Sequence, residues 1–160
     1  MKDRTCCLTG HREIPPEGIP VITKALEDLL TFYIEQGYIY FGTGGAVGFD
    51  TIAAKTVLRL KQQYPEIKLI LVLPCKEQTL YWSQHEIAEY EHIKQSADKI
   101  IYTSEHYYNG CMQKRNRHLV DNSSLCICYL TKPYGGTAYT VKYAQKRKLR
   151  VCNVFTYINL

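Results

Sequence analysis

The chain of 160 residues is 46% hydrophobic and 22% charged, which fits one globular domain spanning residues 1–160. Its net charge of +5 allows an anionic partner without requiring one. The longest apolar run, residues 69–74, is too short to cross a bilayer, and residues 1–4 lead into strand-like sequence without the apolar core of a signal peptide, so we expect a cytoplasmic protein with no membrane partner.

Strand-like and helical patterns alternate along the whole chain. Short apolar runs predict strands at residues 4–8, 38–41, 67–73, 99–102, 125–130 and 151–155. Apolar residues at helical spacing, with a capping box at Ser83 and Glu86 and a terminating Gly37, predict helices at residues 21–33, 51–63, 83–95, 112–122 and 139–148. This regular alternation predicts an α/β fold with a mainly parallel six-stranded sheet and helices on both faces.

The cysteines do not form a metal-binding pattern. There are seven of them, without a C-x-x-C motif. Two close pairs, Cys6-Cys7 and Cys126-x-Cys128, lie in predicted strands, where adjacent residues face opposite sides of the sheet. We therefore expect no metal site and interpret most of the thiols as small buried apolar groups.

A ligand site is expected at one edge of the sheet. Parallel α/β sheets bind their ligands beyond the carboxyl ends of the strands, near the point where the strand order reverses. Five loops follow the predicted strands, and each carries glycine or polar side chains: residues 9–12, 42–50, 74–82, 104–110 and 131–140.

The first glycine-rich turn, residues 42–50, has the sequence GTGGAVGFD. Four glycines in seven positions are more than packing requires, so we interpret the turn as the floor of a phosphate site. It matches neither the dinucleotide fingerprint nor the P-loop pattern, and a tight strand-to-helix turn without a ligand is the alternative. Asp50 either accepts hydrogen bonds from ligand hydroxyls or complements the dipole of the following helix.

A second glycine-rich turn, Gly135-Gly136-Thr137, precedes the last predicted helix. Two such turns in one sheet favour a phosphate site more strongly than either alone. The Thr137 and Thr140 hydroxyls either bind ligand oxygens or cap the helix. The guanidinium of Arg12 either grips a phosphate or is an ordinary surface group.

In the helix at residues 112–122, Arg115 and Asn116 precede Leu119 and Val120 by four residues, so they share the face that packs on the sheet. An inward arginine needs a partner, which is a carboxylate such as Asp50 or Asp121, or a bound anion. The neighbouring Lys114, Arg117 and His118 point the other way.

Trp82, in the loop at residues 74–82, either stacks on a base or packs against the protein.

Motifs spread over the chain resemble a known superfamily. Three occur in the order GGAVGFD (residues 44–50), Arg115-Asn116-Arg117 and Gly135-Gly136-Thr137, and together they resemble the SLOG superfamily, named for the Smf/DprA DNA-processing proteins and the Lonely Guy phosphoribohydrolases. Further segments are similar to the YpsA-like group within it: TGHR (residues 9–12), Pro74-Cys75, Gln78-x-x-x-Trp82 and CMQKRNR (residues 111–117).

The resemblance implies a Rossmann-like three-layer sandwich, a pocket for a nucleotide or nucleotide derivative at the strand carboxyl ends, and a homodimer. Arg12 and the glycine turns would hold phosphate, Asp50 and Asn116 would meet ribose or phosphate oxygens, and Trp82 would contact the base. The residues predicted to bind the ligand are Thr9, Gly10, His11, Arg12, Gly44, Gly45, Gly48, Asp50, Cys75, Gln78, Trp82, Arg115, Asn116, Gly135, Gly136, Thr137 and Thr140.

Our first hypothesis is therefore a non-catalytic or weakly catalytic binder of a nucleotide or nucleotide derivative, without a cofactor, a metal or an assigned catalytic residue. One alternative is single-stranded nucleic-acid binding of the DNA-processing type, through Lys114, Arg117, Lys146, Arg147 and Lys148. The other is a nucleotide N-glycosidase. The phosphoribohydrolase branch uses a catalytic glutamate in the turn P-G-G-x-G-T-x-x-E, and the comparable residues 135–142 contain none, which leaves Glu77 or Glu86 as substitutes.

Overall fold

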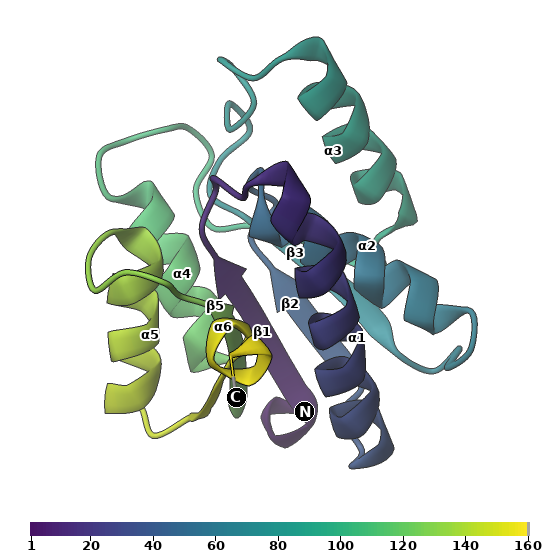
Figure 1. Ribbon diagram of the computed structural model, residues 1–160. Coiled ribbons are helices and arrows are strands. Elements are labelled where there is room, and N and C mark those ends of the chain that lie inside the picture. Colours follow the sequence, from purple (N-terminus) through teal and green to yellow (C-terminus); the bar gives the residue numbers. More distant parts are fainter. Residues whose placement is uncertain (160) are drawn as a thin grey trace.

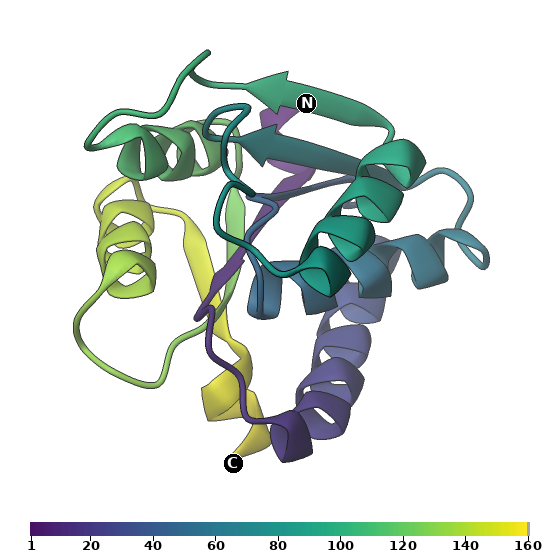
Figure 2. The same ribbon diagram turned by 90° about the horizontal axis from the view of Figure 1, so that it is seen from above.

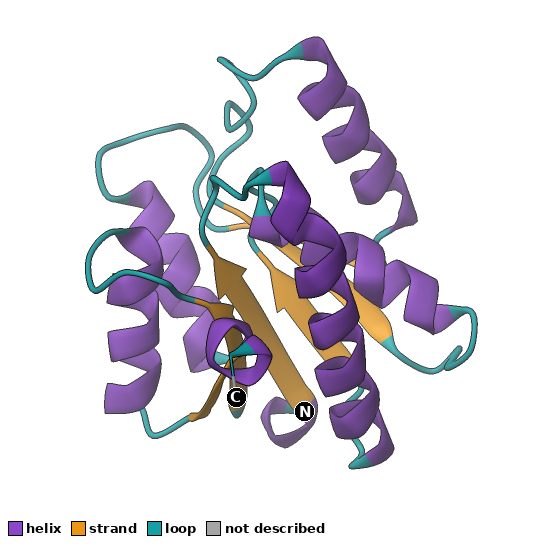
Figure 3. Cartoon of the chain, in the orientation of Figure 1, coloured by secondary structure: helices purple, strands orange, loops and turns teal. Residues whose placement is uncertain are grey.

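The computed structural model describes residues 1–159 as a parallel sheet between two layers of helices (Figures 1 and 3). The strands are β1 (Thr5–Gly10), β2 (Tyr40–Thr43), β3 (Lys68–Leu73), β4 (Lys99–Tyr102), β5 (Leu125–Tyr129) and β6 (Arg150–Asn153). The helices are α1 (Ile19–Glu35), α2 (Phe49–Lys61), α3 (Gln84–Ser96), α4 (Cys111–Asp121), α5 (Gly136–Lys146) and α6 (Val154–Ile158), with short 3-10 turns at Lys2–Arg4 and Pro16–Gly18. The predicted α/β class and six-stranded sheet are confirmed.

The strand order is β4-β3-β2-β1-β5-β6, and every pair of neighbouring strands is parallel. From β1 the chain adds strands in one direction as far as β4, and then crosses back to place β5 on the other side of β1. The carboxyl ends of β1 and β5 therefore flank the point where the strand order reverses. This is where sheets of this kind bind ligands.

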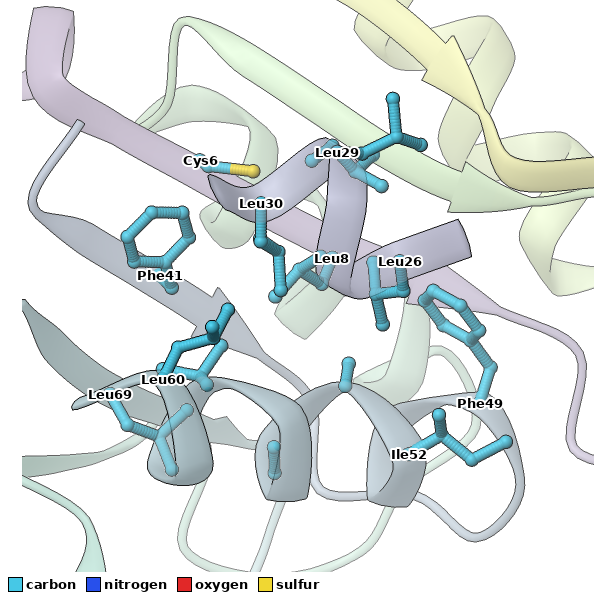
Figure 4. Close-up of a cluster of buried hydrophobic side chains, with 14 of the residues drawn as sticks. Cys6, Leu8, Leu26, Leu29, Leu30, Phe41, Phe49, Ile52, Leu60 and Leu69 are labelled. Atoms are coloured by element: carbon cyan, nitrogen blue, oxygen red, sulfur yellow. The ribbon is translucent and has the colours of Figure 1, made fainter. Parts of the chain in front are cut away.

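Two apolar clusters hold the layers together. The larger one joins the sheet to α1, α2, α3 and α6, and includes Leu8, Leu30, Phe41 and Phe49, none of which is exposed (Figure 4). The smaller one joins the opposite face to α4 and α5. Figure 2 shows these two helices on the side of the sheet away from α1 and α2. Burial of these apolar side chains on both faces explains why the central strands read as continuous apolar runs.

Alternation along the strands sends neighbouring cysteines into different layers. Cys6 belongs to the larger cluster and Cys7 to the smaller one. All seven cysteines are free thiols, six of them buried and Cys152 half-buried. The interpretation of most of these residues as small apolar core groups is confirmed.

The chain departs from the sequence prediction near its C-terminal end. The strand expected at residues 151–155 is β6 (Arg150–Asn153), and the chain then forms α6, which the apolar pattern did not predict. The cause is Asn153, whose Oδ1 accepts the N–H of Phe155 (3.1 Å) and thereby caps the helix. Asn153 also exchanges two hydrogen bonds with the backbone of Leu130 (3.1 and 3.0 Å), so the turn is fixed to the end of β5.

Other local signals are confirmed. Ser83 and Glu86 form both hydrogen bonds of the capping box that begins α3. Gly37 follows the end of α1 with a φ of +104°, the left-handed conformation that glycine adopts readily. No helix within residues 1–159 is both long and apolar enough to span a bilayer.

Candidate functional site

A cavity of about 360 Å³ opens at the carboxyl ends of β1 and β5, and we call it the switch-point cavity. Its walls come from the end of β1, the first glycine turn, the first half of α4 and the segment between β5 and α5. The lining residues are Thr9, Gly10, His11, Arg12, Glu13, Ala46, Asp50, Met112, Arg115, Asn116, Thr131, Lys132, Tyr134, Gly135, Gly136 and Thr137. Ten of the residues predicted from the sequence meet here, from segments more than a hundred residues apart.

The start of α5 forms one wall of this cavity. Gly135 precedes the helix, and no side chain caps it. The first N–H groups of a helix have no acceptor within the helix, and they carry its positive dipole end. A Cβ atom placed on Gly135 or Gly136 would meet no protein atom within 4 Å, and the Thr137 side chain is 8% exposed with no hydrogen bond to another described residue. This wall is therefore open to an anion.

Arg115 also lines the cavity and is 4% exposed. Its guanidinium donates to the carbonyl oxygens of Gly44 and Val72 (3.4 Å to Val72), and its Nε donates to Oδ1 of Asn116 (2.7 Å). Burial lowers the pKa of Arg115, and the charge of Asp50 opposes this effect. The spacing argument that turned Arg115 inward is confirmed.

Neither carboxylate considered as a partner forms an ion pair with this arginine. Among residues 1–159, the ion pair of Asp121 is with Arg147 (3.4 Å), and the Asp121 carboxylate also accepts the hydroxyl of Tyr143 (2.7 Å). Asp50 is 7% exposed and accepts the N–H of Ala46 (3.1 Å) at the start of α2. Arg115 therefore has only neutral hydrogen-bond acceptors among the described residues, and it lines the cavity without an ion-pair partner there.

Asp50 is placed both to complement the dipole of α2 and to contact a ligand, the two roles considered for it from the sequence. It stands in the first turn of α2 and also lines the switch-point cavity. Burial raises the pKa of the Asp50 carboxyl, while Arg115 and the N–H of Ala46 act in the opposite direction. Asp50 and Arg115 therefore give the cavity a buried carboxyl and a buried guanidinium that influence each other's pKa.

The structure corrects our interpretation of the first glycine turn. We expected its glycines to leave room for a ligand, but the chain's own atoms take that room at three of them. An added Cβ would overlap the guanidinium of Arg115 at Gly44, the side chain of Leu73 at Gly45 and the backbone carbonyl of Arg12 at Gly48. These three glycines therefore allow other parts of the chain to pack closely against the turn. The open space lies at Gly135 and Gly136 of the second glycine turn.

His11 and Arg12 lie at the end of β1. The Nε2 atom of His11 accepts the N–H of Thr131 (2.9 Å), which joins the loops after β1 and β5. Burial lowers the pKa of His11, with a smaller contribution from Lys132, so the ring is kept neutral and able to accept this bond. Arg12 is exposed at the cavity mouth, and its guanidinium is free of ion pairs with the described residues.

Four of the predicted residues support the cavity from outside its lining. Gln78 donates to the carbonyl of Gly44 (3.2 Å) and accepts the hydroxyl of Tyr90 (3.3 Å). Trp82 packs edge-to-face on Tyr90, with the ring centroids 5.2 Å apart, and Cys75 is fully buried. The Thr140 hydroxyl donates to the carbonyl of Gly136 (2.9 Å), within α5.

Residues that the sequence prediction missed also line the cavity. Lys132 lies in the loop between β5 and α5 with its Nζ 5.4 Å from the ring centroid of Tyr134, and Met112 lies in the first turn of α4. Both residues could have been found from the sequence, because each lies in a loop or helix start that follows a predicted parallel strand, where ligand sites are expected. With Arg12 and Arg115, Lys132 brings three cationic side chains to this cavity, against the carboxylates of Glu13 and Asp50.

Comparison with known proteins decides the family. Residues 8–160 match the model of the YspA SLOG family (YpsA). The chain belongs to this SLOG family. A UPF0398 protein of Halalkalibacterium halodurans is 33% identical over 134 residues, which cover 82% of this chain and 71% of that one. The uncharacterized SPbeta prophage-derived protein YoqJ of Bacillus subtilis is 32% identical over 140 residues, which cover 80% of both chains.

Two solved structures share the fold of this SLOG family member. DNA processing protein A from Helicobacter pylori, studied for its single-stranded DNA binding mode, superposes with a TM-score of 0.65 at 16% identity, covering 99% of this chain and 72% of that one. The structural genomics target TM1055 superposes with a TM-score of 0.57 at 15% identity, covering 92% of this chain and 72% of that one. These likenesses confirm the Rossmann-like fold.

Proposed function

We propose that the switch-point cavity binds the phosphate group of a nucleotide or nucleotide derivative. The observation that carries this proposal is the pairing of an open helix start with a buried guanidinium. Gly136 and Thr137, in the first turn of α5, line the same cavity as Arg115, whose charge no carboxylate of residues 1–159 neutralises by an ion pair. Helix N–H groups and guanidinium groups are the donors that proteins use for phosphate.

The remaining lining residues support a nucleotide over inorganic phosphate. Arg12 and Lys132 add positive charge at the mouth, while Asp50 and Asn116 offer acceptors for ribose hydroxyls. Binding is favoured over glycoside cleavage because the second glycine turn has threonine and no glutamate: the stretch from Gly135 to Lys142 reads GGTAYTVK. Glu13 is the remaining carboxylate of the lining, and it is exposed.

A thermal-shift panel tests this proposal. A ligand at about one hundred times its Kd stabilises a protein by about 2.7 kcal/mol, which raises the Tm of a domain this size by roughly 5–10 °C. We expect such a rise with at least one member of a panel of nucleoside monophosphates, dinucleotides, cyclic nucleotides and ADP-ribose. A panel without any shift would overturn the proposal.

Gly136→Val locates the binding. The valine side chain projects into the open space at the start of α5, so we expect the ligand-induced rise in Tm to disappear while the Tm of the free protein stays within a few degrees of the wild type. Gln145→Val is the matched control, because Gln145 is exposed on the same helix and outside the cavity lining. An unchanged ligand shift in Gly136→Val would place the ligand elsewhere.

Single-stranded nucleic-acid binding is the second candidate, supported by the fold shared with DNA processing protein A. Of the five cations proposed for it, Arg117 donates to the hydroxyl of Tyr139 (3.0 Å) and Arg147 pairs with Asp121. The other three, Lys114, Lys146 and Lys148, are exposed and form no ion pair with residues 1–159. We expect any such affinity to fall with salt at a log–log slope near −0.7 per phosphate contact, and a flat salt response would exclude it.

A further inference from the structure

A second and larger cavity lies beside the first. It has a volume of about 720 Å³ and runs between the start of α1, the outer face of α2 and the start of α3, and we call it the helix groove. Its apolar lining includes Ile14, Ile19, Val47 and Ile52. Ligand cavities in proteins have volumes of about 300–1,000 Å³, so the helix groove is large enough for a ligand of its own or for part of a long one.

The two cavities are neighbours at Arg12. This residue lines both of them, and the first glycine turn contributes Ala46 to the switch-point cavity and Val47 and Gly48 to the helix groove. The turn is held at this place because Gly48 packs against the backbone of Arg12. A ligand that spans both cavities at this junction would therefore lie next to Arg12.

The two cations that α2 brings to the helix groove are paired within the protein, whereas Arg12 at the edge of the groove forms no ion pair with residues 1–159. Lys55 pairs with Glu89, and Arg59 pairs with Glu27 (3.1 Å). The switch-point cavity differs, because its buried Arg115 has no carboxylate partner among residues 1–159. By this difference the switch-point cavity suits an anionic group, and the groove suits an uncharged group such as a base or a sugar, with apolar contact surface and acceptors for hydroxyls.

Building on the function proposed above, we infer that the ligand is a two-part molecule joined by a diphosphate. One phosphate lies at the start of α5 in the switch-point cavity, and the second lies beside the guanidinium of Arg12. The sugar or nucleoside attached to the second phosphate occupies the helix groove. A nucleoside monophosphate fills only the first of these positions and binds more weakly.

Titration calorimetry with AMP and ADP-ribose as probes tests this inference. We expect the wild type to bind ADP-ribose at least about tenfold more tightly than AMP, a difference of about 1.4 kcal/mol. Thr23→Trp places a large ring in the groove, because Thr23 lines it from α1. This substitution should reduce the affinity for ADP-ribose to that for AMP and leave AMP binding unchanged.

Val21→Trp is the matched control, because Val21 is exposed on the same helix and lines neither cavity. Should Thr23→Trp fail to fold, His85→Trp obstructs the groove from an exposed position at the start of α3. Equal affinities of the wild type for AMP and ADP-ribose would overturn this inference, as would equal weakening of both by the groove substitution. Binding of neither probe or any other nucleotide would instead overturn the proposed function, and this inference with it.

Discussion

Replacing Gly48 by alanine is expected to lower the free energy of unfolding by about 3 kcal/mol. Gly48 has a φ of +82°, where side chains other than glycine are strained, and an added Cβ would overlap the backbone carbonyl of Arg12. Backbone atoms cannot move aside as the end of a flexible side chain can. The first glycine turn and the end of β1 must therefore separate, and Phe49, which is fully buried in the next position, moves with them.

Urea denaturation of Gly48→Ala measures this loss. Gly136→Ala is the matched control, since an added Cβ there meets nothing within 4 Å and alanine favours a helix, so we expect its stability to be unchanged or raised by up to about 1 kcal/mol. Equal stability of Gly48→Ala and the wild type would show that the turn does not pack on Arg12 as described.

Replacing Arg115 by methionine is expected to remove ligand binding and to lower the free energy of unfolding by about 2 kcal/mol. The methionine keeps much of the apolar volume but removes the donors to the carbonyl of Gly44 and to Asn116. The same change removes the buried positive charge from the switch-point cavity. Calorimetric titration and urea denaturation separate the two effects.

Arg115→Lys is the informative comparison for this substitution. A lysine keeps the charge but cannot extend planar donors to Gly44 and Asn116 at once, so we expect binding between that of the wild type and Arg115→Met. Arg117→Met is the control for lost positive charge on α4, because Arg117 does not line the cavity. Ligand binding by Arg115→Met equal to that of the wild type would contradict the role proposed for the guanidinium.

The sequence was sufficient to predict the layers of the fold, because its signals are local. Apolar runs marked the strands, and the capping box at Ser83 marked the start of α3 within one residue. The α6 helix was not predicted, because Phe155 reads as an apolar strand residue until Asn153 is seen to cap the turn before it. A single capping side chain that also binds the end of β5 is a tertiary feature, and periodicity does not report it.

The sequence was a better guide to which residues line the candidate site than to which atoms those residues contact. Helical spacing was enough to turn Arg115 inward, and the topology of a parallel sheet was enough to bring the loops after β1 and β5 together. The acceptor of its guanidinium at Gly44, 71 residues earlier, could not be predicted, because no local pattern marks a backbone carbonyl as a partner. Nor does any local pattern show which distant residues pack against a glycine, so the sequence of the first glycine turn suggested open space where the structure has close packing.

The seven free thiols give the fold a measurable property of a different kind. Burial raises the pKa of Cys6, Cys75 and Cys152, and that of Cys128 to about 12, so the reactive thiolate is scarce while the sheet is closed. Cys6 and Cys128 are fully buried in strands, so a maleimide or disulfide reagent added to the native protein reaches them when the sheet opens, whereas Cys152 is partly exposed in the closed sheet. The rate at which these buried cysteines are labelled therefore reports how often the sheet opens. A ligand bound tightly in the switch-point cavity would stabilise the closed sheet and slow this labelling.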